Sequence, residues 1–224
     1  MSPVCKPVPD PVSIPGRQRG VSLVELLVGL LIALVVMGGA FAAFIAVTNS
    51  SRTNIRADRI NVDVQTLLDL MANDIRRAGY TAIPGTGNPF SRVFPVPTPP
   101  ATSTTSSCFL YSYDYNGNGI QDSQEFFGFR VTNGRVEIRS NGSSDTDCNN
   151  GTWQPLSDPN VMRVANDGLQ FTVANSAVSA PGGALIAERR YVTIQLTATS
   201  TAAADAITKV ARTSVEIRND RRTP

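Results

Sequence analysis

Hydrophobic and polar positions predict one long helix at the start of this chain. Residues 26–47 carry no charged side chain, and at about 1.5 Å per helical residue they would reach roughly 33 Å, enough to cross the apolar core of a bilayer. Further on, apolar residues recur at three- and four-residue spacing, which predicts an amphipathic continuation with one buried face: Ile60, Val64, Leu67, Leu68, Met71, Ile75 and Ala78. We therefore expect a helix over residues 22–78, ended by Gly79 in a left-handed conformation.

The apolar stretch has two other interpretations, a buried core helix and a secretory signal peptide. The run is longer than an ordinary signal-peptide core, and no convincing small-residue cleavage site follows it. A membrane-spanning helix is therefore favoured. Arg17 and Arg19 precede it, and basic residues in that position stay in the cytoplasm, so the rest of the chain should lie outside. Gly38 and Gly39 could allow a bend or close helix packing.

Beyond the helix, the pattern changes to that of a β-rich head. Residues 81–107 are rich in Pro, Gly, Thr and Ser and show no period, which predicts a surface loop. Short alternating or aromatic runs then predict strands at residues 109–113, 126–131, 135–139, 169–174, 191–199 and 213–218. Asn133-Gly134 predicts a tight hairpin. An α+β fold follows, in which a mostly antiparallel sheet covers the apolar face of the helix.

Composition narrows the possible functions. Histidine is absent, which excludes a Ser-His-Asp triad, a Cys-His pair and a histidine-ligated zinc or haem. The net charge of +2 is small and belongs to residues 1–20, where Lys6, Arg17 and Arg19 outnumber Asp10. Arg218, Arg221 and Arg222 could contact DNA or anionic lipid, but we expect them to form a solvated tail. We therefore expect neither an enzyme nor direct nucleic-acid binding.

The junction between the basic segment and the apolar helix carries a specific signal. Gly20 is followed by the apolar Val21, and Glu25 stands five places after the glycine. This arrangement resembles the class III signal of type IV pilins and type II secretion pseudopilins, although most members have Phe where this chain has Val21. The resemblance implies cleavage by prepilin peptidase between Gly20 and Val21, and N-methylation of Val21. It also implies that Glu25 pairs with the terminal amine of a neighbouring subunit in a filament, where two opposite charges are tolerated together.

The end of the long helix indicates which group of these proteins the chain resembles most. Residues 67–80, LLDLMANDIRRAGY, are similar to the helix end of PilW-type minor pilins, and the later segment TSVEIRNDR also resembles that family. J-type pseudopilins of type II secretion end similarly but usually lack the Ala-Gly-Tyr. The resemblance implies a type IV pilin fold with a leader at 1–20, a transmembrane or filament-core half of the helix at 21–48, and a periplasmic head at 49–224.

The same resemblance implies a location and a set of partners. A minor pilin is held in the bacterial inner membrane by a single pass, with its head in the periplasm, and then moves into the pilus fibre or its tip. Its partners are prepilin peptidase, other minor pilins and the major pilin, and its role is to prime or cap assembly. Three alternatives stay open: a J-type secretion pseudopilin, a major pilin, and a membrane-anchored calcium-binding adhesin or enzyme.

Three cysteines are placed in a way that suggests one disulfide. Cys108 and Cys148 lie in the region expected outside the cytoplasm, where disulfides persist, so we predict a bridge between them. Two reduced thiols are the alternative. Cys5 would leave with the leader, which resolves the odd number of cysteines.

Residues 114–125 match the spacing of a calcium-binding loop. Oxygen side chains occupy positions 1, 3, 5, 9 and 12 of an EF-hand pattern, Gly119 takes the turn position, and the carbonyl of position 7 completes the set: Asp114, Asn116, Asn118, Ile120, Asp122 and Glu125. Flanking strands instead of helices and the two Asn residues depart from that pattern, and an Asn-Gly-rich hairpin turn facing water is the alternative. We expect a structural calcium ion of modest affinity.

Other acidic residues give weaker signals. Asp114 and Asp122 could be taken as a carboxylate pair for glycoside hydrolysis, but their Gly- and Asn-rich surroundings favour a turn or an ion site. Asp145 and Asp147, beside Cys148, are expected to form a solvated turn.

Overall fold

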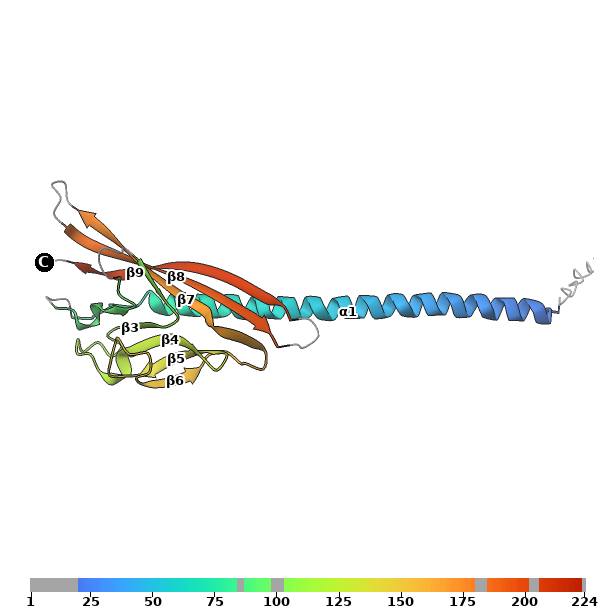
Figure 1. Ribbon diagram of the computed structural model, residues 1–224, viewed down its shortest axis with the longest axis horizontal. Coiled ribbons are helices and arrows are strands. Elements are labelled where there is room, and N and C mark those ends of the chain that lie inside the picture. Colours follow the sequence, from blue (N-terminus) through green and yellow to red (C-terminus); the bar gives the residue numbers. More distant parts are fainter. Residues whose placement is uncertain (1–19, 84–86, 98–102, 180–184, 202–205, 223–224) are drawn as a thin grey trace, which may run out of the picture. The chain divides into compact units, whose positions relative to one another are not determined.

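The computed structural model describes residues 20–83, 87–97, 103–179, 185–201 and 206–222 (Figure 1). The basic leader before Gly20, including Cys5, lies outside the described residues. The pattern of internal contacts divides the chain into two units, Met1–Ser50 and Ser51–Pro224.

One helix, α1 (Leu23–Ile75), runs through most of the predicted helical segment. In the first unit it is apolar on every side, and its large apolar side chains from Leu23 to Val47 are 46 to 72% exposed. A stretch of α1 has a mean hydropathy of 2.7 and no buried residue, which makes it long and apolar enough to cross a membrane. Gly38 and Gly39 do not interrupt the helix, and a side chain at either position would meet nothing within 4 Å.

The second unit combines the later turns of α1 with two antiparallel sheets (Figure 1). The first sheet has the order β1-β3-β4-β5-β6, and the second has the order β2-β7-β8-β9. The strands are β1 (Val93–Phe94), β2 (Ser103–Ser106), β3 (Phe109–Ser112), β4 (Phe126–Thr132), β5 (Arg135–Asn141), β6 (Thr152–Pro155), β7 (Met162–Ser179), β8 (Leu185–Ser200) and β9 (Thr208–Arg222). Two short 3-10 turns, η1 (Pro89–Ser91) and η2 (Ser123–Glu125), complete the elements.

The amphipathic part of α1 supplies one side of the core. All seven apolar positions predicted from the spacing are buried, and Ala72 joins them. They belong to one hydrophobic cluster with side chains of both sheets, including Phe109, Phe129 and Phe171. The α+β class and the covering of the apolar helix face by antiparallel sheet are therefore confirmed.

The predicted hairpin is also confirmed. Thr132 of β4 pairs with Arg135 of β5, which leaves Asn133 and Gly134 as a two-residue turn. Both have positive φ, 53° and 77°, the conformation of a type I′ turn, which matches the twist of the two strands.

Two expectations about the head were wrong. Residues 81–107 are not simply a surface loop, because they contain β1, β2 and the fully buried Phe90. The sheet is also not single, and β6 was not predicted. β1 and β2 were missed because β1 pairs with β3 and β2 pairs with β7, so these short strands are held by distant partners and need no alternation of their own.

Candidate functional site

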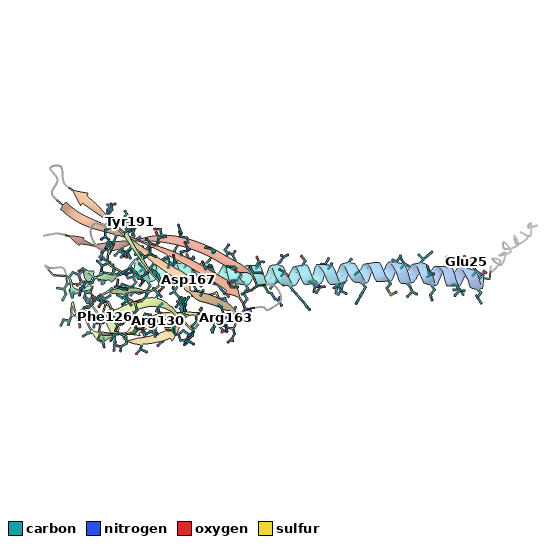
Figure 2. The ribbon with its side chains drawn as sticks, in the orientation of Figure 1. Glu25, Phe126, Arg130, Arg163, Asp167 and Tyr191 are labelled. Atoms are coloured by element: carbon teal, nitrogen blue, oxygen red, sulfur yellow. A yellow bond between two sulfur atoms is a disulfide. The ribbon has the colours of Figure 1, made fainter. Side chains whose placement is uncertain are left out.

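The predicted processing segment lies at the beginning of α1. Gly20 and Val21 precede the helix and are exposed, and Glu25 lies in its first turn (Figure 2). A carboxylate there is favoured by the positive end of the helix dipole. Glu25 is itself exposed, and none of the ion pairs within the described part of the chain involves it. In an apolar environment this charge would need a partner supplied from elsewhere.

A second group of residues surrounds the end of α1. The helix stops at Ile75, a turn continues to Gly79, and Gly79 has φ of 78°, which confirms the predicted left-handed residue. The Gly79 N–H donates to the carbonyl of Ser112 at 2.9 Å, and the Asp114 N–H donates to the carbonyl of Tyr80 at 2.9 Å. The Ala-Gly-Tyr segment is thereby paired with the chain that leaves β3.

Charged residues of the same segment contact aromatic side chains of β3 and of the residue that follows it. The Tyr111 hydroxyl donates to Asp74, and the Arg77 guanidinium lies 4.2 Å from the ring centre of Tyr113. Arg77 also pairs with Asp74 at 3.5 Å. Burial, followed by the nearby Asp74 carboxylate, raises the pKa of Tyr111 well above its usual value. Asp74 and Arg77 therefore have structural partners within the second unit.

Asn219 of β9 is a site residue that the sequence did not single out. Its side-chain amide donates to the carbonyl of Ala78 at 3.1 Å, and so satisfies a backbone group that the end of a helix leaves open. A side chain at Gly79 would come within 2.9 Å of the Asn219 carbonyl oxygen. The two segments that resemble the PilW family, one closing α1 and one in β9, are therefore in contact. The resemblance of both segments to one family was the sequence signal that could have indicated this contact.

The predicted calcium loop folds as a compact turn connected to this helix end. One oxygen of Asp114, Oδ2, accepts the N–H of Gly119 at 3.1 Å and the N–H of Ala82 at 2.9 Å. Glu125 is 1% exposed, and both of its carboxylate oxygens accept backbone N–H groups. Oε1 accepts those of Tyr115 and Asn116, at 2.8 and 3.3 Å, and Oε2 accepts that of Asp122 at 2.9 Å. The loop is thus organised around its acidic side chains.

The remaining predicted ligands line the same turn. Asn116 Oδ1 accepts the N–H of Asn118 at 2.9 Å, and Asn118 Oδ1 accepts the N–H of Ile120 at 2.7 Å. Both side-chain amides donate to Asp122 Oδ2, at 2.9 and 3.1 Å. No group of three acidic, cysteine or histidine side chains in the described part of the chain is arranged to hold a metal alone. Any cation here would depend on amide and backbone oxygens as well.

Cys108 and Cys148 form a disulfide in the structure, with their Cα atoms 6.4 Å apart. Arg130 of β4 holds the second cysteine in place: its Nη1 donates to the carbonyl of Cys148 at 2.8 Å, and its guanidinium lies 4.2 Å from the ring centre of Trp153. The fully buried Arg139 donates to the carbonyl of Ser144 at 2.8 Å. Together these contacts fix the β5–β6 connection onto the sheet.

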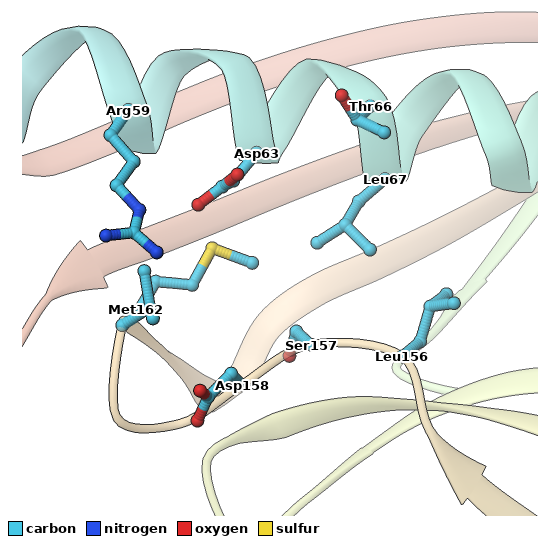
Figure 3. Close-up of a pocket in the computed structure, with 9 residues that line it drawn as sticks. Arg59, Asp63, Thr66, Leu67, Leu156, Ser157, Asp158 and Met162 are labelled. Atoms are coloured by element: carbon cyan, nitrogen blue, oxygen red, sulfur yellow. The ribbon is translucent and has the colours of Figure 1, made fainter.

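A groove of about 300 Å³ lies between α1 and the chain entering β7 (Figure 3). Arg59 and Asp63 point from the helix toward the segment that carries Asp158 and Met162. Ser157 accepts the N–H of Val136 at 2.9 Å and so has a structural partner. The groove therefore has mixed charge and an apolar floor, with no paired nucleophile and base among the described residues that line it.

These features define a pilin-like protein: an exposed apolar helix with one carboxylate in its first turn, continuing into a helix packed on an antiparallel head. Comparison with known families agrees. Residues 53–217 match the family described as prepilin peptidase-dependent protein B, and residues 15–41 match the prokaryotic N-terminal methylation motif. The chain belongs to the prepilin peptidase-dependent protein B family. It is a structural, non-enzymatic protein processed by prepilin peptidase. No curated protein and no solved structure matched the chain.

Proposed function

We propose that this protein is a minor pilin of the PilW type, which assembles with other minor pilins to prime or cap a type IV pilus. The observation that carries the proposal is the contrast along α1. Its first half exposes apolar side chains in every direction, whereas the main apolar face of its second half is already covered by the head. Such a surface is stable only in lipid or against other apolar helices, and a filament core supplies the second environment.

Glu25 and Val21 would form the electrostatic part of that assembly. Cleavage after Gly20 creates a new amino terminus at Val21, and N-methylation keeps its positive charge. Glu25 of one subunit would pair with this amine on a neighbouring subunit. Each charge alone is costly among apolar helices, whereas the pair is tolerated. The pair therefore explains why one carboxylate interrupts an otherwise apolar segment.

The orientation is part of the same proposal. Arg17 and Arg19 would stay in the cytoplasm, which directs the head to the periplasm before assembly. The disulfide between Cys108 and Cys148 supports this side of the membrane, since such bonds persist in the periplasm and on the cell surface.

Incorporation into pili tests the proposal. Glu25→Ala should be cleaved normally but enter sheared pili at a small fraction of the wild-type level. Asp58→Ala, which removes an exposed carboxylate from the same helix, is the matched control and should assemble normally. Wild-type incorporation of Glu25→Ala would contradict the proposed role of Glu25.

The proteins that this chain contacts in cells test whether it belongs to a type IV pilus or to a secretion system. A photo-crosslinking residue placed at Leu34, which is 61% exposed, should capture other minor pilins in intact cells. In sheared fibres the protein should be far less abundant than the major pilin. Capture of secretion pseudopilins would instead assign the chain to the J-type group, and high abundance in the fibre would indicate a major pilin.

A further inference from the structure

The connection between β3 and η2 holds a buried oxygen for which the described part of the chain provides no hydrogen-bond partner. Asp114 is 3% exposed, and its Oδ1 has no hydrogen-bond partner among the residues that the structure describes. The second oxygen of the same carboxyl, Oδ2, accepts the N–H of Gly119 across the loop, so the carboxylate borders the interior of the turn. A buried carboxylate oxygen without a donor is unfavourable unless a cation or a water completes its surroundings.

Several oxygens of the loop keep a lone pair that a cation could use. Asp114 Oδ2 and Glu125 Oε1 each accept two N–H groups and are saturated. Glu125 Oε2 accepts only one, and so do the side-chain oxygens of Asn116 and Asn118, which leaves each of them a lone pair. The Asp122 carboxylate has about four lone-pair positions, of which two amide donors occupy a part.

These oxygens, with Asp114 Oδ1 and the carbonyl of Ile120, supply the six or more ligands that calcium takes in proteins. The chemistry favours calcium over magnesium. Calcium accepts many oxygens in a flexible arrangement, whereas magnesium requires a near-octahedral shell and keeps several waters. Gly119 permits the turn, with φ of 72°, and a side chain there would come within 2.8 Å of Ile83 Cδ1.

We propose that residues 114–125 bind one calcium ion, with the unpartnered Oδ1 of Asp114 as the central ligand. The expected affinity is that of extracellular calcium modules, about 10⁻⁴ to 10⁻³ M, since two of the side-chain ligands are uncharged Asn residues. Because Asp114 also accepts the Ala82 N–H, the ion would fix the segment that follows the end of α1. This site is independent of the pilin assembly proposed above.

Binding is tested on the mature full-length protein in detergent micelles. Calorimetric titration with calcium chloride should give one site, and about 5 mM calcium should raise the midpoint of thermal unfolding by about 3 °C relative to a chelator. The same concentration of magnesium chloride should give a much smaller shift. No calcium-dependent heat and no shift would overturn the proposal, and an equal shift with magnesium would also overturn it.

Asp114→Asn tests whether calcium binds at residues 114–125 or acts elsewhere on the protein. The substitution should weaken calcium binding at least tenfold, while Asp158→Asn should bind as the wild type. Asp158 is a suitable control because it is exposed and its carboxylate also accepts a backbone N–H, that of Asn160, as the Asp114 carboxylate accepts backbone N–H groups. If Asp114→Asn fails to fold, Asp122→Asn is measured in its place, with the same tenfold loss expected. Unchanged binding in the folded variant would contradict the assignment.

Discussion

The two halves of α1 are built from similar apolar residues but use them differently. Leu34, in the first unit, is 61% exposed, whereas Leu68, in the second unit, is 1% exposed. Covalently both belong to one helix, Leu23–Ile75. The difference lies in what the chain provides to cover them: two antiparallel sheets for the second half, and nothing within the described residues for the first.

The two halves of α1 therefore contribute to different properties: the second half to the stability of the head, and the first half to contacts with a membrane or another helix. The apolar face of α1 that begins at Ile60 contributes to the folding of the head, because its burial is completed within one chain. Apolar residues before Val47 contribute only when a membrane or another helix covers them. Substitutions in the two halves should therefore give different defects, and the single tryptophan, Trp153, lies in β6 and reports on the head alone.

The largest effect is expected from a cavity in the head. Leu68→Ala should lower the free energy of unfolding of the head by about 3 to 4 kcal/mol, because a fully buried side chain is removed from a packed core. Denaturant unfolding followed by Trp153 fluorescence measures this. Leu34→Ala is the matched control, with an expected change below about 0.5 kcal/mol. Equal losses in the two variants would remove the contrast between the halves.

The next effect concerns the disulfide. Replacing both Cys108 and Cys148 by Ser should cost about 3 kcal/mol, chiefly because the unfolded chain is no longer restrained. The same fluorescence experiment measures it, with reduced and oxidised wild-type protein as reference. A double variant as stable as the oxidised wild type would show that the contacts of Arg130 and Arg139 hold this connection without the bond.

A smaller effect is expected where the helix ends. Gly79→Ala should cost about 2 kcal/mol, because an L-residue is strained at φ of 78° and its side chain would meet the Asn219 carbonyl at 2.9 Å. Gly38→Ala, in the first half, is the control and should leave the head unchanged, since nothing lies within 4 Å of that position. A neutral Gly79→Ala would contradict the described turn.

The smallest effect tests the cap of the helix end. Asn219→Ala should destabilise the head by about 1 kcal/mol, because the carbonyl of Ala78 loses its side-chain donor. Arg218→Ala, its exposed neighbour, should change the unfolding free energy much less. If the two variants behave alike, the contact between the two family-like segments has no energetic role.

Local sequence was sufficient to predict the elements that have a strong period or a special turn. The buried face of α1 follows from the spacing that begins at Ile60, and the hairpin follows from Asn133-Gly134. Gly79 was predictable because only a glycine readily takes a positive φ after a helix.

Features that depend on distant pairing were not predictable. β1 is held by β3, and β2 is held by β7, so neither strand needs a hydrophobic alternation of its own. Asn219 reaches the helix end only because β9 is placed there by the second sheet. The ligand spacing of the proposed calcium loop was visible in the sequence, but the unpartnered Oδ1 of Asp114 became apparent only in three dimensions.

Maturation of the first half of α1 for assembly is tested most directly by the mass of the amino-terminal peptide of protein isolated from the membrane. We expect a chain that begins at Val21, carries one N-methyl group and lacks residues 1–20. An Asp58→Ala protein should show the same terminus. A mature chain that still carries residues 1–20 would show that this segment is not processed as a pilin.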